Sequence, residues 1–374
     1  MKQTLLIIRW VVGVLFIFSG LVKVNDPLGL TYKMQEFFDV WGWYFFDKYA
    51  LYLAILMNVL EVVCGLALLL GKRMKFFTSL LLLLIVFFTF LTGYALLSGK
   101  IKTCGCLGDC LPLTPLQSFI KDLLLLLLIA VLFSNHKKIT PKINLVLSDI
   151  ILVMTLFGCV FLQQYVLSHL PFYDCLPYKV GNNILEQMKR PKNYLPDSTS
   201  IIYQYKKNGK PIEFDQKNFP EDFDSTYTYV NRVDKLIKKG SNEPKIISFN
   251  LATLSGADTT EAIFNTPKYV MVMSNDYPPN FEKWHSDLLT ARAWCDKNSI
   301  PLFYVTSQSN DALARLSKDN ITILKCDGTI IKTAARVNAT YFLMTKATIF
   351  KKYSYKDFDK ILNSLNTYHF SFKN

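Results

Sequence analysis

Five apolar runs of roughly 20 residues constrain most strongly how this 374-residue chain folds. A helix needs about 20 such residues to cross the hydrocarbon core of a bilayer. The runs lie at about residues 5–24, 50–70, 76–97, 116–133 and 143–170. A cleaved signal peptide is the alternative for the first run, but that run is longer than a usual signal core and lacks a small-residue cleavage pattern. The sequence therefore predicts a protein with five membrane-spanning helices.

Lysine and arginine are unevenly distributed over the short loops and run ends. Basic residues accumulate on the cytoplasmic side of membrane proteins. One side of the predicted bundle carries eight of them: Lys2, Arg9, Lys72, Arg73, Lys75, Lys137, Lys138 and Lys142. Arg9 lies within the first run, and we expect its side chain to extend to the inner membrane surface. This charge bias predicts a bacterial inner-membrane protein with a cytoplasmic amino terminus. The loop 99–115 and all residues after 170 would then lie in the periplasm.

The stretch TCGCLGDC, residues 103–110, places Cys104, Cys106 and Cys110 within seven residues. Three interpretations remain open. In the first, the cysteines take part in thiol–disulfide exchange, in which one thiolate attacks a disulfide and another resolves the mixed intermediate. In the second, they bind a metal together with Cys175, which would be the fourth ligand that structural zinc usually needs, although no histidine lies nearby. In the third, they form two structural disulfides with Cys175, because an extracytoplasmic compartment favours disulfides.

Charges beside these cysteines indicate different roles in thiol exchange. Two lysines precede Cys104 and favour the thiolate, which is the reactive form. Asp109 opposes a thiolate at the neighbouring Cys110. We therefore expect Cys104 or Cys106 to attack and Cys110 to resolve. The remaining cysteines are expected to be buried packing residues: Cys64, Cys159, Cys295 and Cys326.

Several polar side chains interrupt the apolar runs. Glu61 lies near the middle of the second run, where an ionisable group costs at least about 2.5 kcal/mol unless it is paired, protonated or hydrated. Asn58, three residues earlier, lies on the same helix face. Lys23, Lys121 and Asp122 lie near the outer ends of two other runs, which predicts a polar cluster in the outer half of the bundle. Glu61, Lys23 and Asn58 would line a cavity there; the alternative is that Glu61 only joins neighbouring helices.

About 200 residues follow the last apolar run, enough for one domain with its own core. Residues 198–214 alternate apolar and polar side chains around Asn208-Gly209, a dipeptide typical of a tight hairpin. Further on, the pattern predicts two buried strands and the helices around them, then a third strand, a turn region, a strand pair and a closing helix at about 356–365. No basic run with interleaved aromatic residues is present, which excludes nucleic acid as a partner.

This order of elements resembles a thioredoxin-like α/β core at about residues 245–374. The reactive Cys-x-x-Cys of thioredoxin-like proteins follows the first core strand, but that segment reads SNDYPPNFEKW here. The family's cis-proline would fall near Asn338-Ala339, and a cis bond without proline is rare. The resemblance therefore implies a docking module that lacks thioredoxin's own chemistry.

The membrane part resembles the DoxX/MauE group of four-helix, redox-associated membrane proteins over residues 1 to about 135. The resemblance rests on FSGLVKVNDP, on NVLEVVCGLALLLGKR, and on CGCLGDC followed by LTPLQSFIKD. In that group, the MauE branch is associated with disulfide formation in a periplasmic partner and the DoxX branch with quinone-linked oxidation of sulfur compounds. The resemblance implies a redox role and a quinone as the cofactor of the cavity. Such a bundle with a fifth helix and a thioredoxin-like tail resembles chains from Bacteroidota.

Together these patterns predict an α-helical membrane bundle followed by an α/β thioredoxin-like domain. The predicted function is support of extracytoplasmic thiol oxidation or disulfide maturation, with Cys104, Cys106 and Cys110 as the catalytic exchange site. The alternative is a non-enzymatic membrane anchor or scaffold subunit. The expected partners are the lipid bilayer and a periplasmic or membrane protein, and no metal is expected. The predicted regions are a four-helix domain at 1–135, a cytoplasmic loop with the fifth helix at 136–170, and a periplasmic region at 171–374.

Overall fold

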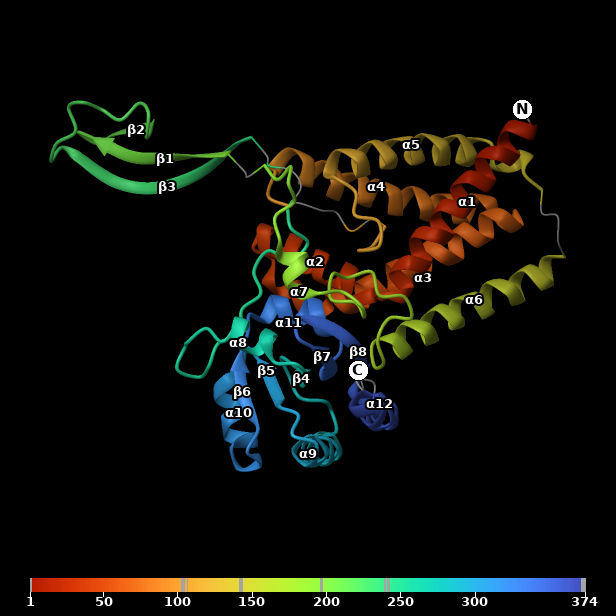
Figure 1. The fold of residues 1–374 in the computed structure, drawn as a ribbon. Helices are drawn as coiled ribbons and strands as arrows, with labels where there is room; N and C mark the ends of the chain where they lie inside the picture. Colours follow the sequence, from red (N-terminus) through yellow and green to blue (C-terminus); the bar gives the residue numbers. More distant parts are fainter. Residues whose placement is uncertain are drawn as a thin grey trace. The chain divides into compact units, whose positions relative to one another are not determined.

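A computed structural model of the chain describes residues 2–101, 105, 107–140, 144–195, 198–238, 240 and 243–370 (Figure 1). These residues divide into two compact units. The first unit combines Met1–Asn182 with Asn250–Asn374, and the second is Asn183–Phe249. The first unit contains a helical bundle and an α/β domain, and the second contains a small antiparallel sheet.

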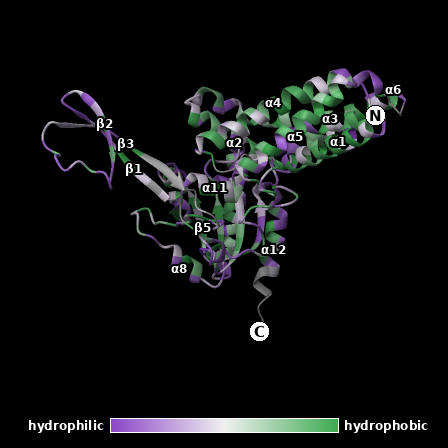
Figure 2. Ribbon diagram, turned by 90° about the horizontal axis from the view of Figure 1, so that it is seen from above, coloured by the Kyte–Doolittle hydropathy of each residue, from purple (hydrophilic) through white to green (hydrophobic). Residues whose placement is uncertain are grey.

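Five helical segments of the described residues are long and apolar enough to cross a membrane, as the sequence predicted. The segments are α1 (Lys2–Asn25), the 3-10 helix η1 (Tyr44–Tyr49) continued by α3 (Ala50–Leu70), α4 (Met74–Ser98), α5 (Pro115–Ser134) and α6 (Leu145–Val166). Figure 2 shows hydrophobic residues along most of the visible length of α1, α3, α4 and α5. A short 3-10 helix, η2 (His136–Lys138), lies between α5 and α6.

Helices α1 and α3 pack closely because small residues face each other between them. A Cβ atom on Gly65 would lie 2.8 Å from the backbone oxygen of Gly13, and one on Gly20 would lie 2.6 Å from the side chain of Val62. Membrane helices associate through such small residues, because lipid supplies no hydrophobic force between them. This packing brings the polar residues of α1 and α3 within bonding distance.

One amphipathic helix of the bundle, α2 (Pro27–Trp41), was not predicted from the sequence. Its start signals are nevertheless present: Asp26 accepts a hydrogen bond from the Gly29 amide, and Pro27 occupies the first turn. Gly42 ends the helix in the left-handed conformation that glycine adopts without strain. The buried side chains recur at helical spacing, at Leu30, Met34, Phe37 and Phe38 among others.

The α/β domain of the first unit is built on a five-stranded sheet of order β6-β5-β4-β7-β8. Strands β4, β5 and β6 run parallel, whereas β7 pairs antiparallel with β4 and with β8. The strands are β4 (Tyr269–Met273), β5 (Leu302–Thr306), β6 (Thr322–Lys325), β7 (Thr340–Thr345) and β8 (Thr348–Ser354). The helices are α8 (Thr260–Asn265), α9 (Phe281–Lys297), α10 (Ser309–Leu316), α11 (Gly328–Ala335) and α12 (Phe358–Phe370), with short 3-10 turns at Ser317–Asp319 and Tyr355–Asp357.

The hydrophobic core of this domain lies between the sheet and the helices that pack on it. Every residue of β4 is buried, as expected for the central strand of a covered sheet. One apolar cluster joins the sheet to α9 through Trp284 and Leu288, to α10 through Leu316 and to α12 through Ile361. The predicted strand, helix, strand, helix, hairpin and closing helix are confirmed. Helix α11 lies in a segment for which the pattern predicted a turn region, and the short helix α8 was not predicted.

The second unit contains the short helix α7 (Ile184–Met188) and the strands β1 (Ser198–Lys207), β2 (Lys210–Asp215) and β3 (Tyr227–Lys238). The strands form an antiparallel sheet of order β2-β1-β3. The predicted hairpin at Asn208-Gly209 is confirmed, since Lys207 pairs with Lys210 across it. Stacked and edge-to-face rings, centred on Tyr205 and Phe214, form the apolar part of this unit.

Candidate functional site

A buried ion pair joins α1 to α3 inside the membrane bundle. The Nζ atom of Lys23 lies 2.5 Å from Oε1 of Glu61, and both side chains are almost completely buried. Ser19 donates a hydrogen bond of 2.9 Å to the other carboxylate oxygen of Glu61. The ammonium of Lys23 also lies 4.8 Å from the centre of the Phe88 ring. The predicted polar cluster is therefore present, and both oxygens of Glu61 are bonded within it.

A second polar group lies between α4 and α5. Asp122 is fully buried and accepts hydrogen bonds from Thr92 on α4, at 3.1 Å, and from the adjacent Lys121, at 2.5 Å. Burying a charge is costly unless it is paired and hydrogen-bonded. Asp122 meets this requirement with one cation and one hydroxyl group.

Both polar groups face one cavity with a volume of about 110 Å³. Its lining combines charged and hydroxyl side chains with apolar and aromatic ones. Leu107 also lines it, and this residue belongs to the cysteine loop between α4 and α5. The lining residues are Leu15, Phe16, Phe18, Ser19, Lys23, Glu61, Ile85, Phe88, Leu107, Lys121, Asp122 and Leu125.

Asn58, the third residue predicted for this cavity, is not among the residues that line it. Its side-chain amide donates to the backbone oxygen of Lys23, at 3.2 Å, and to Oε1 of Gln163 on α6, at 3.0 Å. Gln163 in turn donates a weak bond to the backbone of Ile55 on α3. Asn58 therefore supports the helix that carries Lys23 and attaches α6 to the bundle.

The cysteine loop is attached to the segment after α6 by a disulfide between Cys110 and Cys175. Cys104 and Cys106 lie outside the described residues, so their predicted role stays a prediction. Cys110 was expected to resolve an intermediate within the loop, but in the structure its partner is Cys175 instead. This bond is one of the two disulfides of the staple interpretation. It also removes two of the four sulfur ligands that the metal interpretation requires.

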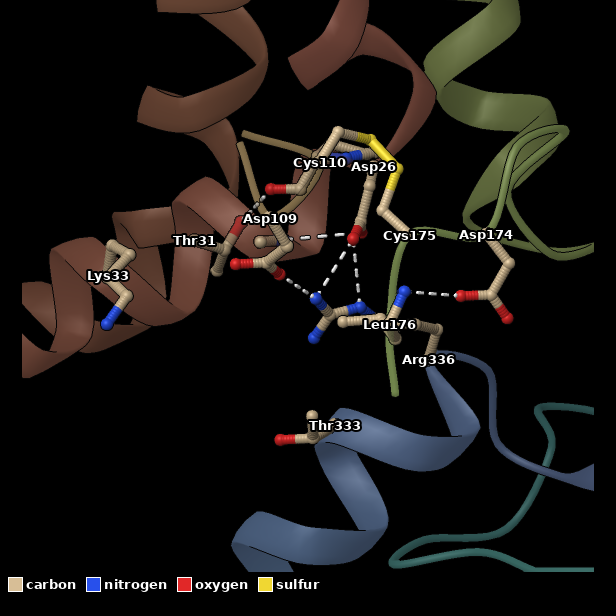
Figure 3. A network of polar contacts seen from close by, with 12 residues as sticks. Asp26, Thr31, Lys33, Asp109, Cys110, Asp174, Cys175, Leu176, Thr333 and Arg336 are labelled. Carbon is tan, nitrogen blue, oxygen red and sulfur yellow. Dashed lines mark hydrogen bonds and ion pairs between the residues drawn. A yellow bond between two sulfur atoms is a disulfide. The ribbon is translucent and has the colours of Figure 1, made fainter. Parts of the chain in front are cut away.

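Arg336, at the end of α11, binds two carboxylates of the membrane part (Figure 3). Its guanidinium donates to Oδ2 of Asp26, at 3.0 Å, and to Oδ2 of Asp109, at 2.5 Å. The arginine side chain is only 3% exposed. Burial raises the pKa of Asp26, and the nearby charge of Asp109 adds to this effect while Arg336 opposes it. We call these three residues the arginine clamp.

A second ion pair lies close to the disulfide. Lys352 on β8 is buried, and its Nζ lies 2.9 Å from Oδ2 of Asp174, the residue before Cys175. Burial lowers the pKa of Lys352, whereas the bond to Asp174 favours its charged form. Ser354 donates a hydrogen bond of 2.6 Å to the backbone oxygen of Ser168. The α/β domain is thus held to the bundle by the clamp, by β8 and by a covalent bond nearby.

Asn275 lies in the segment that follows β4, which reads SNDYPPNFEKW from Ser274 onward and contains no cysteine. Its backbone amide donates to the side-chain oxygen of Asn338, and its side chain donates to the backbone oxygen of Gly328 and accepts from Ser307. The Asn338-Ala339 peptide bond is cis although no proline follows Asn338, so the rare conformation is present at the position where the family's cis-proline was expected. Asn275 therefore ties four loops of the domain together and brings no thiol to them.

The free cysteines of the described residues are buried, as expected. Burial raises the pKa of Cys295 and that of Cys326 to about 12. A cysteine with such a pKa is almost entirely in its unreactive thiol form near neutral pH. Thiol chemistry in the α/β domain is therefore not supported by either residue.

Sequence reasoning missed the arginine clamp and the Lys352–Asp174 pair. Asp26 carried a usable signal, because an aspartate directly before Pro27 is typical of a helix start. No sequence signal marked Arg336 or Lys352, because arginine and lysine usually lie on the surface and only the fold shows that these two are buried.

Apolar crossing helices, a charged cavity and a disulfide-bonded outer loop define a membrane protein with an attached α/β domain. Residues 1–135 match the model of the family of the methylamine utilisation protein MauE, so this part of the chain is similar to that family. Residues 199–239, which cover most of β1 to β3, match a domain of unknown function, DUF8463. No solved structure matches the chain.

A relative of the chain is Protein TlpB from Flavobacterium psychrophilum. It is 28% identical over 140 residues, which are 37% of this chain and 38% of TlpB. The match thus spans less than two-fifths of that protein's length.

Proposed function

We propose that the protein supports thiol oxidation or disulfide maturation on the outer side of the bacterial cytoplasmic membrane. Cys104 and Cys106 are the exchanging pair of this proposal. The observation that carries it is that Leu107, the residue after Cys106, lines the same cavity as Lys23 and Glu61. The cysteine loop is therefore in contact with a charged cavity inside the membrane bundle.

The proposed exchange uses the two loop cysteines in their oxidised form. A thiolate of a partner protein attacks the Cys104–Cys106 disulfide and forms a mixed disulfide. The partner's second thiolate then breaks this bond, so the partner gains a disulfide and the loop becomes a dithiol. Two electrons and two protons pass from the partner to the loop in this way.

The loop must pass these electrons on before it can act again, and the cavity is the proposed site of the acceptor. A quinone accepts two electrons and two protons when bound. The cavity suits its head group because Phe16, Phe18 and Phe88 provide ring faces, while Lys23 and Lys121 bring cationic donors. Glu61 and Asp122 are the carboxylates that would hold or move protons there.

Differential alkylation of native membranes tests this proposal. Thiols are trapped by acid, alkylated before and after reduction, and the peptide that contains Cys104 and Cys106 is quantified by mass spectrometry. We expect a mixture of both redox states that becomes more reduced when the respiratory quinone pool is reduced. Glu61→Gln should slow reoxidation, whereas Glu36→Gln, which alters a half-exposed pair on α2, should not. A pair that stays oxidised under all these conditions would contradict the proposal.

A scaffold function is the second candidate, and a specific observation favours it. The segment after β4 in the α/β domain contains no cysteine, and the arginine clamp fixes this domain to the bundle. A scaffold would keep its partner bound when Cys104 and Cys106 are both replaced by serine. An exchange protein would lose partner disulfides in that variant but remain inserted and folded.

A further inference from the structure

A cavity with a different character lies at the amino-terminal end of α1, about one helix length or roughly 35 Å from the arginine clamp. Its volume is about 320 Å³. It lies between the start of α1 and the segment that joins α5 to α6. The lining residues are Lys2, Gln3, Leu5, Leu6, Arg9, Lys138, Ile139 and Thr140.

Arg9 is the unusual residue of this cavity. It was expected to extend to the membrane surface, but it is buried and only 3% exposed. Its Nε atom has no hydrogen-bond partner within the described part of the chain. A buried polar atom without a hydrogen-bond partner is costly, and an anion in the cavity would supply the acceptor that Nε of Arg9 lacks.

The surroundings of Arg9 are cationic. Lys2 and Lys138 line the same cavity, and none of the described residues that line it is acidic. Lys138 donates a hydrogen bond of 2.8 Å to the neutral side chain of Asn135. The acidic side chain at this end of α6, Asp149, is paired with Lys72. The cavity therefore presents positive charge to whatever enters it.

The same cavity also has an apolar side, formed by Leu5, Leu6 and Ile139. A free phosphate ion would be recognised by the cations alone. A group with a phosphate at one end and hydrocarbon at the other would contact both parts of the lining. Exposed apolar residues continue along α1 at Ile7 and Trp10, where a hydrocarbon chain would follow the helix.

We propose that this cavity binds the phosphate of an anionic phospholipid, with Arg9, Lys2 and Lys138 as its cationic ligands. Basic pockets between membrane helices are suited to anionic head groups. Arginine is particularly suited to phosphate, because its planar guanidinium forms two parallel hydrogen bonds to the oxygens. The site is independent of the thiol exchange proposed above.

Native mass spectrometry of the full chain, released from nanodiscs, tests this site. The probes are dimyristoylphosphatidylglycerol and dimyristoylphosphatidylcholine, which share acyl chains and differ in net charge. We expect phosphatidylglycerol to be retained at least about tenfold more than phosphatidylcholine. Equal retention of the two lipids would overturn the proposal. Displacement of bound phosphatidylglycerol by millimolar inorganic phosphate would also overturn it and indicate a free-anion site.

Matched variants locate the binding. Lys138→Gln changes a residue of the connecting segment, so it should leave the bundle folded and reduce the preference for phosphatidylglycerol about tenfold or more. Lys137→Gln removes the same charge from the neighbouring residue of η2, which does not line the cavity, and should leave the preference unchanged. Arg9→Gln should abolish the preference if the protein folds. Equal losses in Lys137→Gln and Lys138→Gln would show that only bulk charge attracts the lipid and would overturn the site.

Discussion

The buried guanidinium of Arg336 forms an ion pair with Asp109 across 227 positions of sequence, with Nη2 2.5 Å from Oδ2. Asp109 immediately precedes the cysteine that forms the disulfide, and Arg336 lies two residues before the cis peptide bond. The pair therefore connects the cysteine loop of the membrane part to the loop next to Asn275 in the α/β domain. It fixes the end of the segment that carries Cys104 and Cys106.

Replacing this arginine should therefore be costly. Arg336→Ala would leave Asp26 and Asp109, whose side chains are 18% and 35% exposed, without their cation. Because water reaches both carboxylates, the free energy of unfolding should fall by about 1–3 kcal/mol. Arg315→Ala removes an exposed i,i+4 pair of the same domain and should cost about 0–1 kcal/mol. Pulse proteolysis of the α/β domain in urea, on the full-length protein in detergent, measures both. Similar losses for the two variants would contradict a clamp.

The disulfide can be tested by cutting the chain between its two cysteines. A protease site inserted in the connection between α5 and α6 divides the chain into a part with Cys110 and a part with Cys175. We expect the parts to run together on a gel without reductant and to separate with it. In Cys175→Ser they should separate under both conditions, whereas Cys159→Ser should behave as the unaltered chain.

The ion pair inside the membrane bundle should respond non-additively to substitution. Glu61→Gln alone leaves Lys23 buried without its counter-charge and should destabilise the bundle by about 3–5 kcal/mol. The double variant Lys23→Met with Glu61→Gln removes both charges and should recover much of this loss. Thermal unfolding in detergent measures the stability of each variant and so the interaction energy between Lys23 and Glu61. If the double variant is stable but its loop cysteines reoxidise slowly, the pair serves the cavity; normal reoxidation would assign it to helix packing.

The buried thiols of the α/β domain should not react until the domain unfolds. With a pKa of about 12, the thiolate fraction of Cys295 or Cys326 at pH 8 is about one in ten thousand. Because the thiolate is the reactive form, alkylation should increase as the pH rises toward 12. Labelling with iodoacetamide at pH 8, followed by peptide mass spectrometry, should show both residues unmodified in native protein and modified in denaturant. Rapid labelling of native protein at pH 8 would contradict the burial.

The orientation predicted from charge can be tested with reporter fusions. A reporter that is active only in the periplasm should be active when fused after Asn374 and inactive within residues 137–142. The reverse pattern would place the cysteine loop in the cytoplasm and remove the compartment in which disulfides persist. It would also place the proposed lipid site in the outer leaflet.

Periodicity and burial costs explain why much of the molecule could be predicted. The long apolar runs admit only membrane helices, and the alternating strands and amphipathic segments of the tail specify their own secondary structure. Lys23 and Glu61 could be connected because two charges inside apolar helices have few arrangements that avoid a large penalty. The cost of burying a charge depends on its immediate surroundings in the chain, so it can be recognised from the sequence.

The pairings between distant segments could not be predicted in this way. The four outer cysteines, at positions 104, 106, 110 and 175, allow three sets of two disulfides, and no local signal selects the partner of Cys110. Arg336 becomes special only because docking buries it beside two carboxylates. Arg9 shows the same limit, since its distance from the end of the helix suggested a surface position and the packing of the connecting segment buries it.

The bond between Cys110 and Cys175 also closes a covalent ring that passes along α5 and then back along α6. Helix α6 buries few of its described residues, so lipid surrounds most of its surface. The ring ties the outer end of α6 to the cysteine loop, which keeps the side chains of Gln163 and Asn58 close together. Without the disulfide, noncovalent contacts alone would hold that end, among them the hydrogen bond from Ser354 to the backbone oxygen of Ser168. Reduction of this one bond would therefore increase the lateral mobility of the fifth helix.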